Sequence, residues 1–105
     1  MNTQENNKII AEFMGITPNE AGVYHVSKHK GYSLENLLYH TSWDWLMPVV
    51  EGMESMGYNV SIMRRCWVVV FDTNVMKEIV SIERRASKLE VTHEAVVEFI
   101  KQYNK

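Results

Sequence analysis

The spacing of apolar residues changes twice along this chain, and this change restricts its possible folds more than any other feature. Between residues 58 and 82 apolar side chains tend to alternate with polar ones, as in half-buried strands. On either side the apolar residues recur every three or four positions, as in helices. The candidate strands hold Val60 and Ile62, then residues 67–71, then residues 75–82. We therefore expect an antiparallel meander between helical segments.

The middle strand of this meander lies in the longest apolar run of the chain, residues 66–71. We expect Trp67, Val69 and Phe71 to face the core, because they lie two residues apart. The residues 72–74 (DTN) predict a tight turn to the next strand. Cys66 is the only cysteine, so no intramolecular disulfide forms, and we expect its thiol to behave as a small buried apolar group.

Residues 34–56 show the helical spacing, with an apolar stripe that runs from Leu46 to Met56 before Gly57. Thr41 and Asp44 are three residues apart, which predicts a capping box in front of the stripe. Pro48 lies inside this pattern, so we expect a bend between residues 44 and 48.

Helices are also predicted at both ends of the chain. The first helix is expected to begin with Asn2 or Thr3 as its cap and to end at Gly15, and residues 23–26 predict a short strand after it. The last begins with Ser87 and Glu90 as a capping box and carries apolar residues on one face as far as Tyr103. This order predicts one α+β domain, residues 1–105, in which helices sandwich an antiparallel sheet of three or four strands, an α/β/α sandwich.

Composition narrows the functions that we expect. The formal net charge of -2 differs from the strongly basic character of proteins that coat DNA, so nucleic acid is a disfavoured partner. Residues 1–8 are polar, and the longest apolar run is far shorter than the roughly 20 residues of a membrane-spanning helix. We therefore expect a cytoplasmic chain with no membrane partner.

Three segments resemble the phage ABA sandwich domain, a family of small proteins from bacteriophages and prophages. They are residues 7–15 (NKIIAEFMG), 39–50 (YHTSWDWLMPVV) and 95–101 (AVVEFIK). The chain departs from the family's usual pattern at His93 and Gln102. The resemblance implies a small domain in which helices sandwich a sheet, and it implies no particular activity.

Two groups of residues suggest catalytic or metal chemistry, and in both the simpler interpretation is favoured. His25 and His29 have a spacing that would suit a metal on a helix, but lysines flank His29 and no acidic residue lies nearby. His40, Ser42 and Asp44 are the residue types of a catalytic triad, yet side chains so close along one turn point in different directions. We therefore expect no catalytic site, no metal and no cofactor.

Two candidate binding surfaces remain. Trp43, Trp45 and Met47 form an aromatic-rich helix start, and one of the two tryptophans must point away from the apolar stripe, where it would mark a surface for a partner protein or for self-association.

The second candidate surface consists of Arg64, Arg65, Arg84 and Arg85. In an antiparallel meander these four arginines meet at one end of the sheet, where they would suit a phosphate or a carboxylate. The residue patterns thus predict a non-enzymatic protein-binding module, and the resemblance implies a small phage-derived or prophage-encoded accessory protein. The alternative is a nucleic-acid or phosphate-ligand binder that uses the arginines.

Overall fold

The computed structural model describes residues 3–27, 30–64 and 66–104. Its elements, in chain order, are α1 (Thr3–Phe13), β1 (Tyr24–Ser27), β2 (Lys30–Tyr32), the 3-10 turn η1 (Leu34–Asn36), α2 (Trp43–Ser55), β3 (Tyr58–Met63), β4 (Trp67–Asp72), β5 (Lys77–Glu83) and α3 (Lys88–Tyr103). Both sheets are antiparallel: β1 and β2 form a hairpin, and the other strands form a three-stranded sheet in the order β3-β4-β5. The predicted α+β class and the predicted meander are confirmed.

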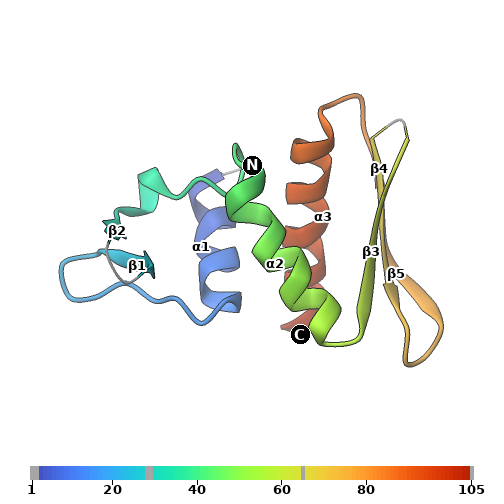
Figure 1. Ribbon diagram of the computed structural model, residues 1–105, viewed down its shortest axis with the longest axis horizontal. Helices are drawn as coiled ribbons and strands as arrows, with labels where there is room; N and C mark the ends of the chain where they lie inside the picture. The colour runs from blue at the N-terminus through green and yellow to red at the C-terminus, as the bar shows by residue number, and fades with distance from the viewer. Residues whose placement is uncertain (1–2, 28–29, 65, 105) are drawn as a thin grey trace.

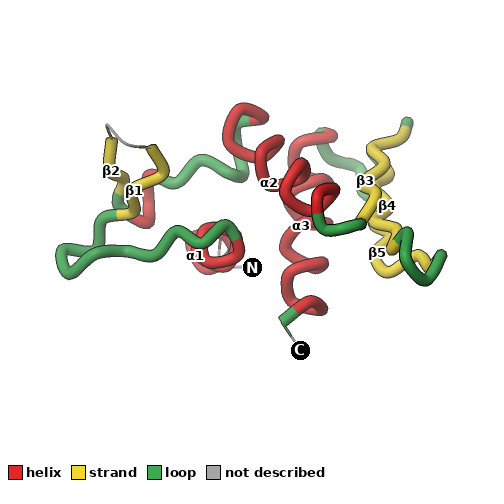
Figure 2. The backbone as a smooth tube through the Cα atoms, turned by 60° about the horizontal axis from the view of Figure 1, so that its bottom comes forward, coloured by secondary structure: helices red, strands yellow, loops and turns green. Residues whose placement is uncertain are grey.

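The helices lie between the two sheets, as Figure 1 shows. The view in Figure 2 agrees: the β1-β2 hairpin is at one side of the molecule, the three-stranded sheet is at the other, and α1, α2 and α3 are between them. The three-stranded sheet therefore has helices on one face, whereas the sequence suggested helices on both. The outer face can be exposed to solvent because it carries the polar side chains of Ser61 and Ser81, which flank Val69 in the strand register.

The core forms where the inner face of the three-stranded sheet meets α3. Val60, Val70 and Val80 lie side by side across the three strands, and Val70 and Val80 are buried. The facing stripe of α3 is almost continuously buried, with Phe99 and Ile100 among its largest side chains. On the far side of α3, the buried Ile10 and Ala11 of α1 belong to the same apolar cluster. Two helices and a sheet thus share one core through α3.

The predicted helix ends agree with the structure at two places. Ser87 is the N-cap of α3 and its side chain accepts a hydrogen bond from the backbone N–H of Glu90, which confirms the capping box. Gly15 has φ +77°, a left-handed conformation that favours glycine, and it lies just after the end of α1. Thr3 is the first residue of α1 and not its cap, and Asn2 lies outside the described residues.

The prediction of one helix over residues 34–56 is wrong. The chain turns at η1, leaves helical geometry at Leu37 (ψ 128°), and enters α2 only at Trp43. The Thr41–Asp44 capping box is also wrong, because the N-cap is Ser42 and its side chain accepts no capping hydrogen bond. Burial explains the break: Leu37 and Tyr39 are both buried, and side chains two residues apart reach the same side only in extended chain.

Two predictions for the sheet are also wrong. The last strand begins at Lys77 and not at residue 75, because Met76 has φ +54°, which ends the turn and does not fit a strand. Trp67 is not a core residue: its side chain is 38 % exposed on the outer face, where its indole N–H donates to Ser81 Oγ over 2.8 Å. The expected burial of Cys66 is only partial. Among the described helices, none has both the length and the apolar character that crossing a membrane requires.

Candidate functional site

One pocket lies at the N-terminal ends of α1 and α3 and beside the start of α2. Its lining includes the first residue of α1, Thr3, together with Thr41 and Ala86, which immediately precede the N-caps of α2 and α3. All three helices start at the same end of the molecule and run in the same general direction (Figure 1). We call this cavity of about 630 Å³ the three-helix pocket.

A buried carboxamide organises one wall of the three-helix pocket. Asn7, on α1, is only 2 % exposed. Its Nδ2 donates to the backbone oxygen of Leu37 over 3.0 Å and lies 2.9 Å from His40 Nδ1. Its Oδ1 lies 3.0 Å from Nε2 of His93 on α3. One side chain therefore joins α1, the segment before α2 and α3.

These contacts determine where the imidazole protons lie. The Leu37 carbonyl can only accept, so it requires the NH₂ group of Asn7 on its side and leaves Oδ1 for His93. His93 must then donate from Nε2, and His40 must accept at Nδ1. Each neutral ring keeps one further nitrogen: a donor at His40 Nε2 and an acceptor at His93 Nδ1.

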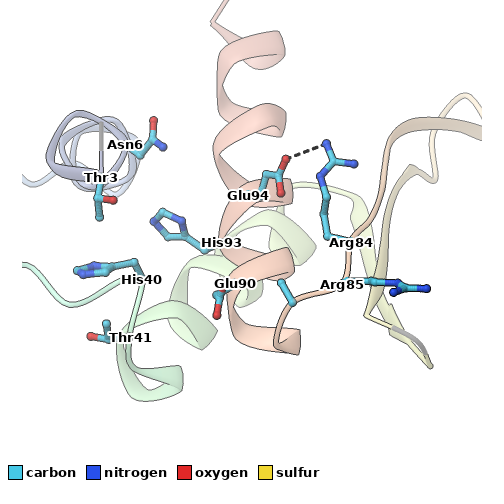
Figure 3. A pocket seen from close by; sticks show the side chains of 10 residues that line it. Thr3, Asn6, His40, Thr41, Arg84, Arg85, Glu90, His93 and Glu94 are labelled. Atoms are coloured by element: carbon cyan, nitrogen blue, oxygen red, sulfur yellow. Dashed lines mark hydrogen bonds and ion pairs between the residues drawn. The ribbon is translucent and has the colours of Figure 1, made fainter. Parts of the chain in front are cut away.

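The surroundings of His93 keep it uncharged at neutral pH. Burial, and then repulsion from the charged form of His40, lower the pKa of His93 from 6.5 to about 4. The two ring centroids are 6.1 Å apart, so the rings are neighbours in the pocket (Figure 3). The wall thus offers a ligand hydrogen-bonding groups without a fixed charge on His93.

The opposite wall carries charged side chains of both signs. Arg84 forms an ion pair with Glu94 over 3.2 Å and also donates to the backbone oxygen of Glu83. Glu90 is held by the α3 cap, where its Oε1 accepts from the Ser87 hydroxyl over 3.3 Å. The guanidinium of Arg85 points away from the histidines, whereas that of Arg84 lies beside Glu94 (Figure 3). The side-chain charges of this wall balance, and only Arg84 places its guanidinium beside a wall residue.

The structure brings part of the predicted arginine group together. Trp67 pairs with Glu83 in the strand register, and the backbone N–H of Arg84 donates to the carbonyl oxygen of Cys66 over 3.4 Å. The start of β4 and the end of β5 therefore lie at the same end of the sheet, as predicted. Arg84 and Arg85 both line the three-helix pocket. Arg64 is exposed in the turn after β3 and does not line it, and Arg65 lies outside the described residues.

The predicted aromatic surface separates into two environments. Trp43 and Met47 are each 36 % exposed, one helical turn apart on α2. Trp45 is half-buried on another side of α2, where its ring meets those of Tyr32 and Tyr39 in edge-to-face contacts. Trp43 is therefore the tryptophan that points away from the apolar stripe.

The structure does not bring His40, Ser42 and Asp44 together in one site, and it places His25 next to Asn19. His40 lines the three-helix pocket, whereas Asp44 lines a different, smaller pocket. His25 Nε2 lies 3.4 Å from the Asn19 side-chain nitrogen, and His29 is outside the described residues. Within residues 3–27, 30–64 and 66–104, no three His, Cys, Asp or Glu side chains are placed to hold a metal ion.

Asn7 and His93 are the functional candidates that sequence reasoning missed. Both occupy positions on apolar stripes: Asn7 precedes the buried Ile10 and Ala11 by three and four residues, and His93 precedes Val96 and Val97 in the same way. A polar residue in the middle of a buried stripe must find a hydrogen-bond partner or destabilise the fold. That rule could have singled out each residue, although not the partnership between them.

Comparisons with protein-family models, with curated proteins and with solved structures find no match to this chain. The resemblance to the phage ABA sandwich domain stays a prediction.

Proposed function

We propose that this chain binds a small ligand with an anionic group, a phosphate or a carboxylate, in the three-helix pocket. The observation that carries the proposal is that Arg84 and His40 line one cavity together with the first turns of α1 and α3 and the segment just before α2. Each helix N-terminus presents backbone N–H groups and a partial positive charge of about half an elementary charge, so such ends favour anions.

The polar groups in the pocket suit a small ligand. Arg84 has donors beyond those used by Glu94 and Glu83, and a guanidinium matches two oxygens of a phosphate or carboxylate at once. The donor at His40 and the acceptor at His93 would bind neutral parts of the same ligand. Because Glu90 and Glu94 balance the two arginines, a polyanion such as nucleic acid is disfavoured.

We also propose that the pocket binds its ligand without covalent catalysis. In the described part of the chain, neither histidine is hydrogen-bonded to a serine, threonine or cysteine side chain. A nucleophile activated by an adjacent base would need such a contact.

A titration of the full chain with inorganic phosphate at low ionic strength tests the proposal. Arg84→Gln should weaken binding by about tenfold or more, because it removes a charged hydrogen-bond donor and leaves Glu94 unpaired. Glu94→Gln should strengthen it by up to about fivefold, because it removes a competing carboxylate. The matched control is Arg64→Gln, which removes the same charge outside the pocket and should leave affinity nearly unchanged.

The outcomes are distinct. Equal effects of Arg84→Gln and Arg64→Gln, or no binding by the wild type, would overturn the proposal. If a single-stranded oligonucleotide binds far more tightly than phosphate and its affinity falls steeply with salt, the ligand is nucleic acid instead.

A second candidate function is protein binding or self-association through an exposed apolar surface. Three large apolar side chains are exposed on the first turns of α2 and in the loop before it: Leu38 (39 %), Trp43 (36 %) and Met47 (36 %). Exposed apolar side chains of this size can mark a surface for a partner protein. Light scattering after size exclusion should show an oligomer that Trp43→Ala dissociates without unfolding. A wild type that is monomeric at all concentrations would count against self-association.

A further inference from the structure

A second, smaller pocket lies between α2 and the segments that precede it, and three of its seven lining residues are aromatic. We call this cavity of about 310 Å³ the aromatic pocket, and it is lined by Met14, Ile16, Tyr32, Tyr39, Asp44, Trp45 and Pro48. It shares no lining residue with the three-helix pocket, so an inference from it does not rest on the proposed anion site.

The rings of the aromatic pocket meet at steep angles. The Tyr32 and Trp45 ring planes are inclined at 78° with centroids 4.8 Å apart, and those of Tyr39 and Trp45 at 88° with centroids 5.2 Å apart. Rings that stand nearly perpendicular to one another form a corner, and a group in that corner is within about 6 Å of several centroids, the range of cation–π attraction.

One wall of the pocket carries a negative charge that no cation in the described chain neutralises. Asp44 is exposed in the first turn of α2, forms no ion pair there, and does not serve as a capping residue. A carboxylate beside aromatic rings favours a cation over a neutral apolar group of the same shape.

Tyr39 contributes a hydroxyl to the same wall. Tyr39 as a whole is 2 % exposed, but its hydroxyl is not among the buried polar atoms and makes no hydrogen bond to the described residues, so it remains accessible to solvent. A ligand that carries its own polar group next to the cation can take the place of water at this hydroxyl.

We propose that the aromatic pocket binds a quaternary ammonium group, such as the trimethylammonium of choline or of a methylated lysine. Such a cation is bulky and weakly hydrated, so it leaves water for aromatic faces more readily than a primary ammonium does. The rings of Trp45 and the two tyrosines attract its charge, Asp44 adds a full counter-charge, and the hydroxyl of choline is a hydrogen-bond partner for Tyr39.

The experiment is a titration of the full chain with choline chloride, followed at the indole N–H resonance of Trp45. The neutral isostere of choline, in which carbon replaces nitrogen, has the same shape without the charge and should bind about tenfold more weakly. Ethanolamine, a primary ammonium, should also bind more weakly. Free trimethyllysine and a trimethyllysine peptide, titrated in parallel, distinguish a small metabolite from a modified protein as the source of the cation.

Two exposed carboxylates on α2 give a matched pair of variants. Asp44→Asn should weaken choline binding about fivefold. Glu51→Gln removes the same charge from an exposed position outside the pocket and should have no effect. Because both side chains are exposed, neither substitution threatens the fold. Equal affinity for choline and its neutral isostere, or equal effects of the two variants, would overturn the proposal, and so would the absence of any shift at Trp45.

Discussion

Asn7, beside the three-helix pocket, and Tyr39, in the wall of the aromatic pocket, are each 2 % exposed, but of the two side chains only Asn7 has hydrogen-bond partners among the described residues. The Asn7 carboxamide binds three groups from separate parts of the chain, whereas the Tyr39 hydroxyl binds none of the described residues. The difference separates two roles of polar groups. A buried polar group whose partners lie within the chain stabilises the fold, and a hydroxyl that solvent can reach in a pocket wall is available to a ligand.

The largest effect that would test this comparison is expected from Asn7→Leu. The substitution keeps a similar volume but leaves the Leu37 carbonyl and His93 without their partner, so it should lower the free energy of unfolding by about 3 kcal/mol or more. Urea unfolding at neutral pH measures the loss. Lys8→Leu, at an exposed position of the same helix, should change stability by less than about 0.5 kcal/mol. If the two variants are equally stable, the Asn7 contacts do not stabilise the fold.

A second effect depends on pH and concerns His93. The unfolded chain takes up a proton at this histidine near pH 6.5, and the folded chain only near pH 4. The stability that neutral His93 contributes is therefore fully present above pH 6.5. As pH falls towards 4, the free energy of unfolding should decrease by up to about 1.4 kcal/mol per pH unit. Unfolding of the wild type and of His93→Gln, measured between these limits, isolates this contribution from that of the carboxylates. If the free energy of unfolding falls equally with pH in the wild type and in His93→Gln, His93 makes no such contribution.

The smallest effect is expected from Tyr39→Phe. Because the hydroxyl makes no hydrogen bond to the described residues, its removal should change the free energy of unfolding by less than about 0.5 kcal/mol. The same urea series measures it. A loss above about 1 kcal/mol would show that the hydroxyl has a partner after all, and the contrast with Asn7 would disappear.

The sequence predicted well where local rules decide the structure. The capping box of Ser87 and Glu90 and the end of α1 at Gly15 follow from a few neighbouring residues. It predicted poorly where the pattern is ambiguous. Residues 67–71 are all apolar, so their alternation cannot say which face is buried. The register decides it: Val68 and Val70 lie beside apolar residues of β3 and β5 and face the core, and Trp67 therefore faces outwards.

Part of the candidate site could be predicted from the sequence. A meander places the end of its third strand beside the start of its second, and this put Arg84 and Arg85 at one sheet end. The contact between Asn7 and His93 follows from no local rule, because the two residues are 86 positions apart and meet only through the packing of α1 on α3.

That separation has a consequence for how the molecule is made. The hairpins of the three-stranded sheet close over short loops, so they can form early, whereas the contact between Asn7 and His93 closes most of the chain into one loop and carries a larger entropic cost. During synthesis the three-helix pocket cannot exist until α3 has left the ribosome. A ligand bound there would therefore recognise the chain only after α1 has packed on α3, and its binding would report that contact.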